Sequence, residues 1–108
     1  MQVKAALSLS GPVNVGLSAE NDRWYDYQGG VVDWADCDPE HVDHAVLGVG
    51  WGTDSSFGDY LLVKNSWGAD WGEQGYFRIS LSQKYSRKGI CGVLTDFTQA
   101  CVGSKCDV

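Results

Sequence analysis

The 108-residue sequence predicts a small, mainly β domain that folds as an antiparallel barrel or a small sandwich. Short runs of branched and aromatic residues alternate with turns that hold many of the 14 glycines, which is typical of strands joined by tight connections. Only one stretch, near the N-terminus, has the composition of a helix. With 44% hydrophobic and 20% charged residues the chain is globular, and its length suits one compact core.

The first part of the chain predicts one helix and one short strand, followed by a short apolar run. Residues 2–9 are rich in helix-forming residues, and Gly11 with Pro12 ends the predicted helix. Residues 13–17, VNVGL, are typical of a short strand. A polar turn and an aromatic cluster follow, and a second short apolar run begins after Gly29 and Gly30.

The second part predicts a central strand, two further strands and a last short one. Residues 36–43 have loop composition, and residues 44–52, HAVLGVGWG, form an apolar run whose glycines indicate close backbone approach. The sequence GVGWG lacks the third glycine of a nucleotide-binding turn, and no helix follows it. The remaining predicted elements are a hairpin-like loop at 53–59, strands at 61–63, 76–79 and 90–97, and a weakly structured tail at 97–108.

Charge and hydropathy exclude several partners. The formal net charge of −6 and the absence of a basic stripe argue against nucleic acid, because the acidic surface repels phosphates. No apolar run approaches 18 residues, so we expect no membrane span. The N-terminal residues lack the apolar core and cleavage site of a signal peptide.

The cysteines predict disulfides rather than a metal site. No CxxC pair is present, and only His41 and His44 are available to complete a zinc site, so we expect no metal and no cofactor. An even cysteine count in a short, tryptophan-rich chain favours disulfides and an oxidising compartment. Reduced, buried thiols are the alternative. The four cysteines are Cys37, Cys91, Cys101 and Cys106.

Residues 61–79, LLVKNSWGADWGEQGYFRI, place Asn65 at the end of a strand and follow it with Trp67 and Trp71. His44 opens another predicted strand 21 residues earlier, so neighbouring antiparallel strands could bring the two side chains to one rim. Asparagine can fix the direction of an imidazole without adding charge, which suits a histidine that works beside a thiolate. Indoles that exclude water would strengthen that hydrogen bond. The alternative is that His44 is a buried structural histidine and Asn65 a turn residue. Asp43, next to His44, either changes the basicity of the imidazole by its charge or is a solvated loop carboxylate.

Two blocks of this sequence, VDHAVLGVGWG at 42–52 and KNSWGADWGEQGYFRI at 64–79, closely resemble the histidine and asparagine blocks of the papain-like cysteine peptidases. The segments GPVNVGL and GICGV occur in the order that this family uses, and the resemblance runs from about residue 4 to about residue 96. Trp51 stands where tyrosine is usual. The resemblance implies that residues 1–108 form a single domain, the carboxy-terminal antiparallel β-barrel lobe of the two-lobed α+β fold, with a short N-terminal helix.

By this resemblance His44 is the catalytic base and acid, Asn65 its orienting partner, and Trp67 the shield over their hydrogen bond. Trp71 is expected beside the leaving-group side of the cleft. No block resembling the family's nucleophilic cysteine and oxyanion glutamine is present, so the resemblance implies a thiol endopeptidase whose nucleophile comes from an amino-terminal helical lobe. The chain by itself is then expected to be inactive.

The resemblance also implies a substrate pocket, disulfides and a location. Gly16, Val42 and Ala45 are expected as pocket walls beside Asp43, with Asp96 as the floor. Relatives with an acidic residue there resemble cathepsin B and accept arginine as well as apolar side chains, and the alternative is an Asp96 that faces solvent. Peptides or proteins are the expected substrates, and a propeptide or protein inhibitor is a further partner. The expected location is lysosomal, vacuolar or secreted. The expected disulfides are Cys37–Cys91, implied by the family, and a local pair of Cys101 with Cys106.

A non-catalytic module that binds peptides or carbohydrate is the rival interpretation. Five tryptophans and five tyrosines could supply stacking faces for such ligands. A module that only binds has no reason to keep His44 and Asn65 together with the tryptophans around them. This pair therefore favours the peptidase.

Overall fold

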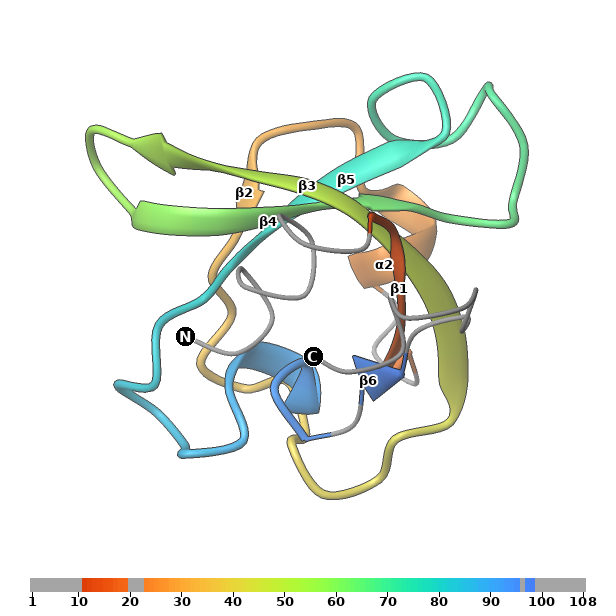
Figure 1. Cartoon of the computed structure of the whole chain (residues 1–108). Coiled ribbons are helices and arrows are strands. Elements are labelled where there is room, and N and C mark those ends of the chain that lie inside the picture. Colours follow the sequence, from red (N-terminus) through yellow and green to blue (C-terminus); the bar gives the residue numbers. More distant parts are fainter. Residues whose placement is uncertain (1–10, 20–22, 96, 99–108) are drawn as a thin grey trace.

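Six strands form one sheet in the order β2-β5-β4-β3-β1-β6 (Figure 1). The computed structural model describes residues 11–19, 23–95 and 97–98, the last two by their backbone alone. The elements are β1 (Val13–Leu17), α2 (Arg23–Asp26), β2 (Val31–Val32), β3 (His44–Asp54), β4 (Gly58–Lys64), β5 (Tyr76–Ser80), η1 (Ile90–Gly92) and β6 (Phe97–Thr98).

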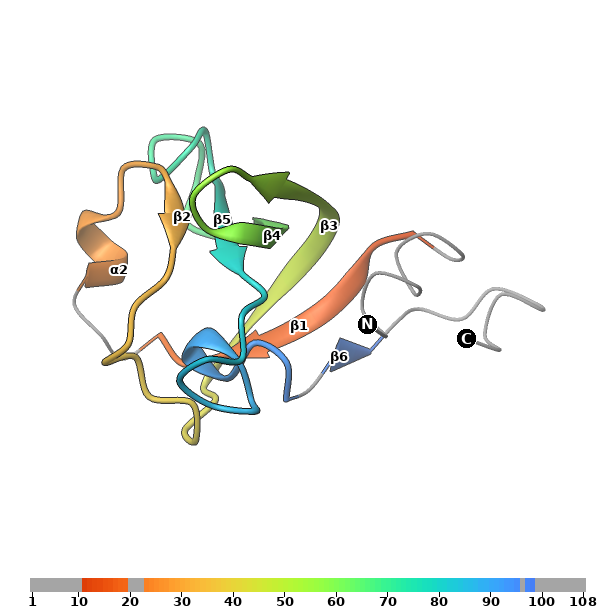
Figure 2. The same cartoon turned by 90° about the vertical axis from the view of Figure 1, so that its left-hand side faces the viewer.

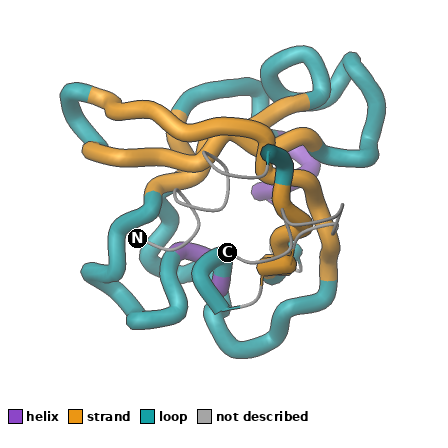
Figure 3. Tube along the Cα trace, in the orientation of Figure 1, coloured by secondary structure: helices purple, strands orange, loops and turns teal. Residues whose placement is uncertain are grey.

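The long strand β3 connects the two halves of the sheet. Its first residues pair with β1 and its later residues with β4, and the register shifts between Gly48 and Gly50. A Cβ atom at Gly48 would lie 3.2 Å from a methyl group of Val13, so glycine allows β1 to pack closely there. The sheet curls, so that the end of β1 and β6 lie near η1, below β3, β4 and β5 in the view of Figure 1 (Figures 2 and 3).

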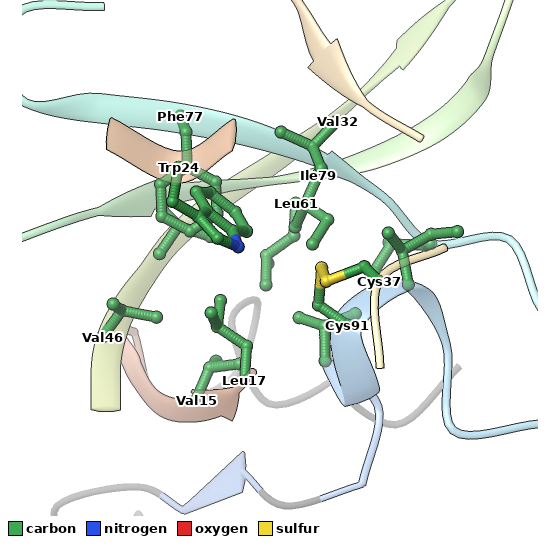
Figure 4. Close-up of a cluster of buried hydrophobic side chains, with 14 of the residues drawn as sticks. Val15, Leu17, Trp24, Val32, Cys37, Val46, Leu61, Phe77, Ile79 and Cys91 are labelled. Atoms are coloured by element: carbon green, nitrogen blue, oxygen red, sulfur yellow. A yellow bond between two sulfur atoms is a disulfide. The ribbon is translucent and has the colours of Figure 1, made fainter. Parts of the chain in front are cut away.

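The inner face of the curled sheet is closed by apolar side chains. Alternate residues of β1, β4 and β5 point inward, as the buried positions Val13, Val15 and Leu17 of β1 show. Trp24 of α2 fills the centre between Phe77 and the β1 side chains (Figure 4). Burying each of these large side chains contributes about 1.5–3 kcal/mol, so this cluster is the main source of stability.

A disulfide joins Cys37, in the loop between β2 and β3, to Cys91 of η1 (Figure 4). The predicted Cys37–Cys91 pairing is therefore confirmed, and Cys101 and Cys106 lie outside the described residues. The bond closes a loop between residues 54 positions apart, for which chain entropy gives about 4 kcal/mol. The loop that leads into His44 is thereby fastened to η1.

The predicted strands at 13–17, 44–52, 61–63 and 76–79 are confirmed, with β3 and β4 longer than expected. The strand predicted at 90–97 is wrong except for its last residue, because η1 and a turn occupy this segment. Cys91 adopts φ 55° there, and its carbonyl accepts a hydrogen bond from Ser18 N–H at 2.8 Å. The apolar residues of this segment are buried because the disulfide holds η1 and the following turn against the core. They therefore have an apolar pattern without pairing as a strand.

Two features of the sheet differ from the prediction. Strand β2 pairs with β5 in parallel, so the sheet is mixed rather than wholly antiparallel. The tail predicted as weakly structured from residue 97 begins with β6, which pairs with β1. The predicted helix at 2–9 and the tail at 99–108 lie outside the described residues. Within the described part of the chain, no helix has the length and apolar character needed to cross a membrane.

A half-buried ion pair fastens the turn after α2 to β5. Arg78 donates from Nε and Nη2 to the two carboxylate oxygens of Glu73 at 3.0 and 2.9 Å, and Gly30 N–H donates to Glu73 at 3.2 Å. The Arg78 hydrogen bond holds the pKa of Glu73 below its ordinary value. Tyr27 donates its hydroxyl proton to the Gly30 carbonyl at 2.6 Å, and burial raises the pKa of Tyr27 to about 12. The phenol therefore remains a neutral donor throughout the physiological range.

Glu73→Gln should lower the free energy of unfolding at pH 7 by about 1 kcal/mol, because the variant loses a charge-assisted pair. A depressed carboxyl pKa stabilises the fold above the unfolded value of about 4.3 and ceases to do so as pH falls through the folded value. The difference between wild type and variant should therefore be full at pH 6 and be lost below about pH 4.3, as pH falls through the depressed folded pKa of Glu73. Urea unfolding followed by tryptophan fluorescence measures this difference.

Glu40→Gln is the matched control, since Glu40 pairs with Lys88 but its side chain is 58% exposed. This control should change the free energy of unfolding by less than half as much. An equal loss of unfolding free energy in both variants would show that the pair of Glu73 and Arg78 stabilises the fold no more than an exposed ion pair does.

Candidate active site

The pairing of β3 with β4 brings His44 and Asn65 together at the rim of the sheet. His44 is the first residue of β3, and Asn65 directly follows β4, whose last residue Lys64 pairs with Leu47. His44 Nε2 lies 2.9 Å from Asn65 Oδ1. Because a carbonyl oxygen only accepts, Nε2 carries the proton and donates it to this bond. The other imidazole nitrogen, Nδ1, is left as the basic one in the neutral ring.

Asn65 is held by two hydrogen bonds and by burial. Its backbone N–H donates to the Gly75 carbonyl at 3.0 Å, and its Oδ1 also accepts from Ser66 N–H at 2.8 Å. The residue is only 5% exposed. The amide oxygen is therefore fixed before His44 approaches it, which gives the imidazole a single preferred orientation.

Two tryptophans lie behind the histidine, at different depths. The Trp67 ring is 5.4 Å from the His44 ring, and the Trp71 ring meets Trp67 edge-on at 5.2 Å. Trp71 packs on Tyr27 and Phe77, and its indole N–H donates to the Trp24 carbonyl at 2.6 Å. Trp67 thus lies next to His44, and Trp71 connects Trp67 to the core.

The predicted pocket walls come together on one side of His44. Gly16 pairs with Ala45 across β1 and β3, and both line a pocket of about 390 Å³ together with Val42 and Asp43. Asn14, Val15 and His44 complete the lining. Asp96, the predicted floor, lies outside the described residues.

Asp43 is bound to backbone that follows β1. Its Oδ1 accepts from Ala19 N–H at 2.8 Å, and its own N–H donates to the Leu17 carbonyl at 3.1 Å. These bonds fasten the loop before His44 to the end of β1. Nearby, the exposed His41 bonds to Asp38 and holds the pKa of that carboxyl below its ordinary value.

No free thiol faces His44 among the described residues. Cys37 and Cys91 form the disulfide, and the other two cysteines are outside the described part of the chain. Within residues 11–19, 23–95 and 97–98, no cluster of histidine, cysteine and acidic side chains could hold a metal ion. The described part of the site thus pairs an imidazole with an amide oxygen, and neither described cysteine is a free thiol.

One neighbour of the site was missed from the sequence. Tyr25 of α2 stacks on Trp67 with ring centroids 5.2 Å apart and an interplanar angle of 2°. The aromatic cluster around Trp24 was recognised, but a helix of four residues carries no periodicity that would show which ring faces the site.

Comparisons with known proteins agree with this architecture. A family model described as papain family cysteine protease matches residues 1–101. Cathepsin L of Sarcophaga peregrina is 44% identical over 94 residues, covering 87% of this chain and 26% of that protein. A cathepsin L-like protein of Caenorhabditis elegans is 45% identical over 94 residues, covering 87% and 27%.

Solved structures show the same fold. The bromelain protease of Ananas comosus, in complex with the E64 inhibitor, superposes with a TM-score of 0.75 at 39% identity, covering 88% of this chain and 42% of that chain. The cysteine protease CMS1MS2 of Carica candamarcensis, in complex with E-64, gives 0.69 at 41% identity, covering 80% and 37%.

The fold and these relatives define a lobe of a papain-like protease. The chain belongs to the papain family of cysteine proteases. It spans about a quarter of the length of the curated relatives that it matches.

Asp43→Ala should speed hydrogen exchange at the Ala19 N–H by about tenfold, because this amide loses its acceptor. Asp43→Asn keeps an oxygen at the same place and should leave the rate within about threefold of wild type. Amide exchange followed by NMR measures both rates. Equal acceleration in both variants would mean that charge, rather than the hydrogen bond, holds this loop.

Proposed function

We propose that this chain is the lobe of a cysteine-type endopeptidase that carries the catalytic histidine and asparagine. The observation that supports the proposal is the 2.9 Å bond between His44 Nε2 and Asn65 Oδ1, which leaves Nδ1 as the basic nitrogen. A base that is oriented by a second, fixed group is what nucleophilic catalysis requires.

In the proposed reaction, His44 Nδ1 takes the proton of a cysteine thiol, and the resulting thiolate attacks the peptide carbonyl. The imidazolium then gives that proton to the departing amine as the C–N bond breaks, which leaves an acyl thioester. A water molecule attacks the thioester while Nδ1 accepts its proton, and the proton returns to the thiolate as the acid product leaves. Asn65 keeps the ring oriented through both transfers. Because its amide is neutral, it adds no second negative charge beside the imidazolium and the thiolate.

The nucleophile is proposed to come from an amino-terminal helical lobe. The outer face of β1, β3 and β4 supports this proposal, because it carries a hollow of about 360 Å³ beside Asn65 that includes Ala45, Leu47 and Lys64. Apolar residues on the outer face of a sheet favour contact with another layer of structure. A lobe seated there would bring its thiol to the same rim as His44.

The proposed substrates are peptides or proteins, with one side chain entering the pocket of Gly16, Val42 and Ala45. A propeptide or a protein inhibitor is proposed as a further partner of the same cleft. A lysosomal, vacuolar or secreted location is proposed, and the Cys37–Cys91 disulfide supports an oxidising compartment.

The chain alone should not hydrolyse peptides, whereas the chain mixed with the amino-terminal lobe of a related enzyme should. His44→Ala should abolish the activity of the mixture, and Asn65→Ala should lower kcat by about a hundredfold, because the base loses its orientation. A dipeptidyl fluorogenic substrate measures the rate, and E-64 should block it.

Tyr85→Phe serves as the control and should leave kcat within about threefold of wild type, because Tyr85 is 49% exposed and its ring contacts Lys84. Activity of the chain by itself, abolished by thiol alkylation, would contradict the two-lobe proposal. Binding of peptides without hydrolysis in a correctly assembled mixture would support the non-catalytic module instead.

Asp96→Ser in the complete enzyme should lower kcat/KM by about tenfold for substrates with arginine two residues before the cleaved bond. A carboxylate at the pocket floor would attract a guanidinium, and desolvation leaves about 1–2 kcal/mol of net preference. Substrates with leucine at that position should be cleaved at an almost unchanged rate. Equal losses for arginine and leucine would show that Asp96 does not contact the substrate side chain.

A further inference from the structure

The orientation of Trp67 depends on ring contacts. Among the described residues, no hydrogen bond holds its indole N–H, whereas Trp24 and Trp71 each donate theirs to a backbone carbonyl. Trp67 also lies outside any strand or helix, three residues after the end of β4. Its ring contacts the rings of Tyr25, His44 and Trp71, and Trp67 also packs against the core cluster.

Tyr25 is placed by a well-anchored helix and is itself exposed. The adjacent Trp24 is buried in the core, donates to the Ser18 carbonyl at 3.1 Å and accepts from Trp71 through its own carbonyl. Tyr25 is 69% exposed, so it adds little to the core, yet its ring is parallel to that of Trp67 within 2°. Offset stacking at a centroid distance of 5.2 Å is an attractive arrangement for two aromatic rings.

We propose that Tyr25 is a positioning residue, which holds Trp67 over the hydrogen bond between His44 and Asn65. The stack limits rotation of the indole on the solvent side, while Trp71 limits it on the core side. An indole that stays in place keeps water from the Nε2–H donor and preserves the orientation of the imidazole. The contribution of Tyr25 to catalysis rests on the proposed function, whereas its effect on the hydrogen bond is a property of this chain alone.

The test measures exchange of the His44 Nε2–H proton with solvent, by NMR on the ¹⁵N-labelled chain. Tyr25→Ala should speed this exchange by about three- to tenfold, which corresponds to the loss of one aromatic stack. Tyr25→Phe keeps the ring and should restore a rate within about twofold of wild type. Nuclear Overhauser contacts between Trp67 and His44 should weaken in Tyr25→Ala and persist in Tyr25→Phe.

Tyr85→Ala is the matched control, because Tyr85 is a tyrosine at 49% exposure whose ring contacts Lys84, on a loop that does not touch the site. It should leave the exchange rate at the wild-type value. An unchanged rate in Tyr25→Ala, or equal acceleration in Tyr85→Ala, would overturn the proposal. If Tyr25→Ala disturbs the fold, as backbone amide shifts would show, Tyr25→Leu replaces it with the same two criteria.

The exchange rate is measured without substrate and without a second lobe, so it does not depend on peptidase activity. A lobe mixture that lacks activity, together with the expected exchange rates, would refute the proposed function and leave the role of Tyr25 intact. An active mixture with unchanged exchange in Tyr25→Ala would refute the role of Tyr25 alone.

Discussion

The register between β3 and β4 is the constraint on which the site depends. Leu47 pairs with Lys64, so the start of one strand and the end of the other meet at the same rim, where His44 bonds to Asn65. A slip of one residue would turn every side chain of a strand to the opposite face. The buried residues of β4 and the close approach at Gly48 exclude such a slip, because it would expose Leu61 and Val63. The geometry of the contact between His44 and Asn65 is therefore a consequence of core packing.

The loop side of the molecule depends on a different kind of constraint. There are no ladder hydrogen bonds over residues 33–43, and the path of this loop is set by the disulfide at Cys37 and by the bonds of Asp43 to backbone near the end of β1. Val42 also approaches Gly92, where any larger residue would meet the Pro39 carbonyl. These contacts fix the segment that ends at His44. The histidine is thus held on one side by the sheet and on the other by covalent and polar links.

Periodicity made the sheet predictable from the sequence, and its absence explains what was missed. The strands at 13–17, 44–52, 61–63 and 76–79 each have enough residues to show apolar or alternating patterns. Helix α2 and strand β2 have four and two residues, so their form is decided by tertiary contacts. The apolar residues 90–94 resemble a strand, yet the disulfide and the positive φ of Cys91 turn the chain there. The spacing of His44 and Asn65 could suggest their contact, whereas the stack of Tyr25 on Trp67 joins elements that only the fold brings together.

Under the proposed function, this arrangement separates two tasks that a catalytic site must perform. Described residues of this chain position the imidazole of His44, through the bond to Asn65, the indole of Trp67 and the core behind Trp71. Under the proposed function, a second lobe has only to bring a thiol to Nδ1, since the imidazole does not need to be oriented again on assembly. Pre-organisation of this kind reduces the entropy that must be lost when the lobes meet and when the substrate binds. A rim location is consistent with such a division, because side chains at the edge of a sheet can be fixed by their own lobe and still face a partner.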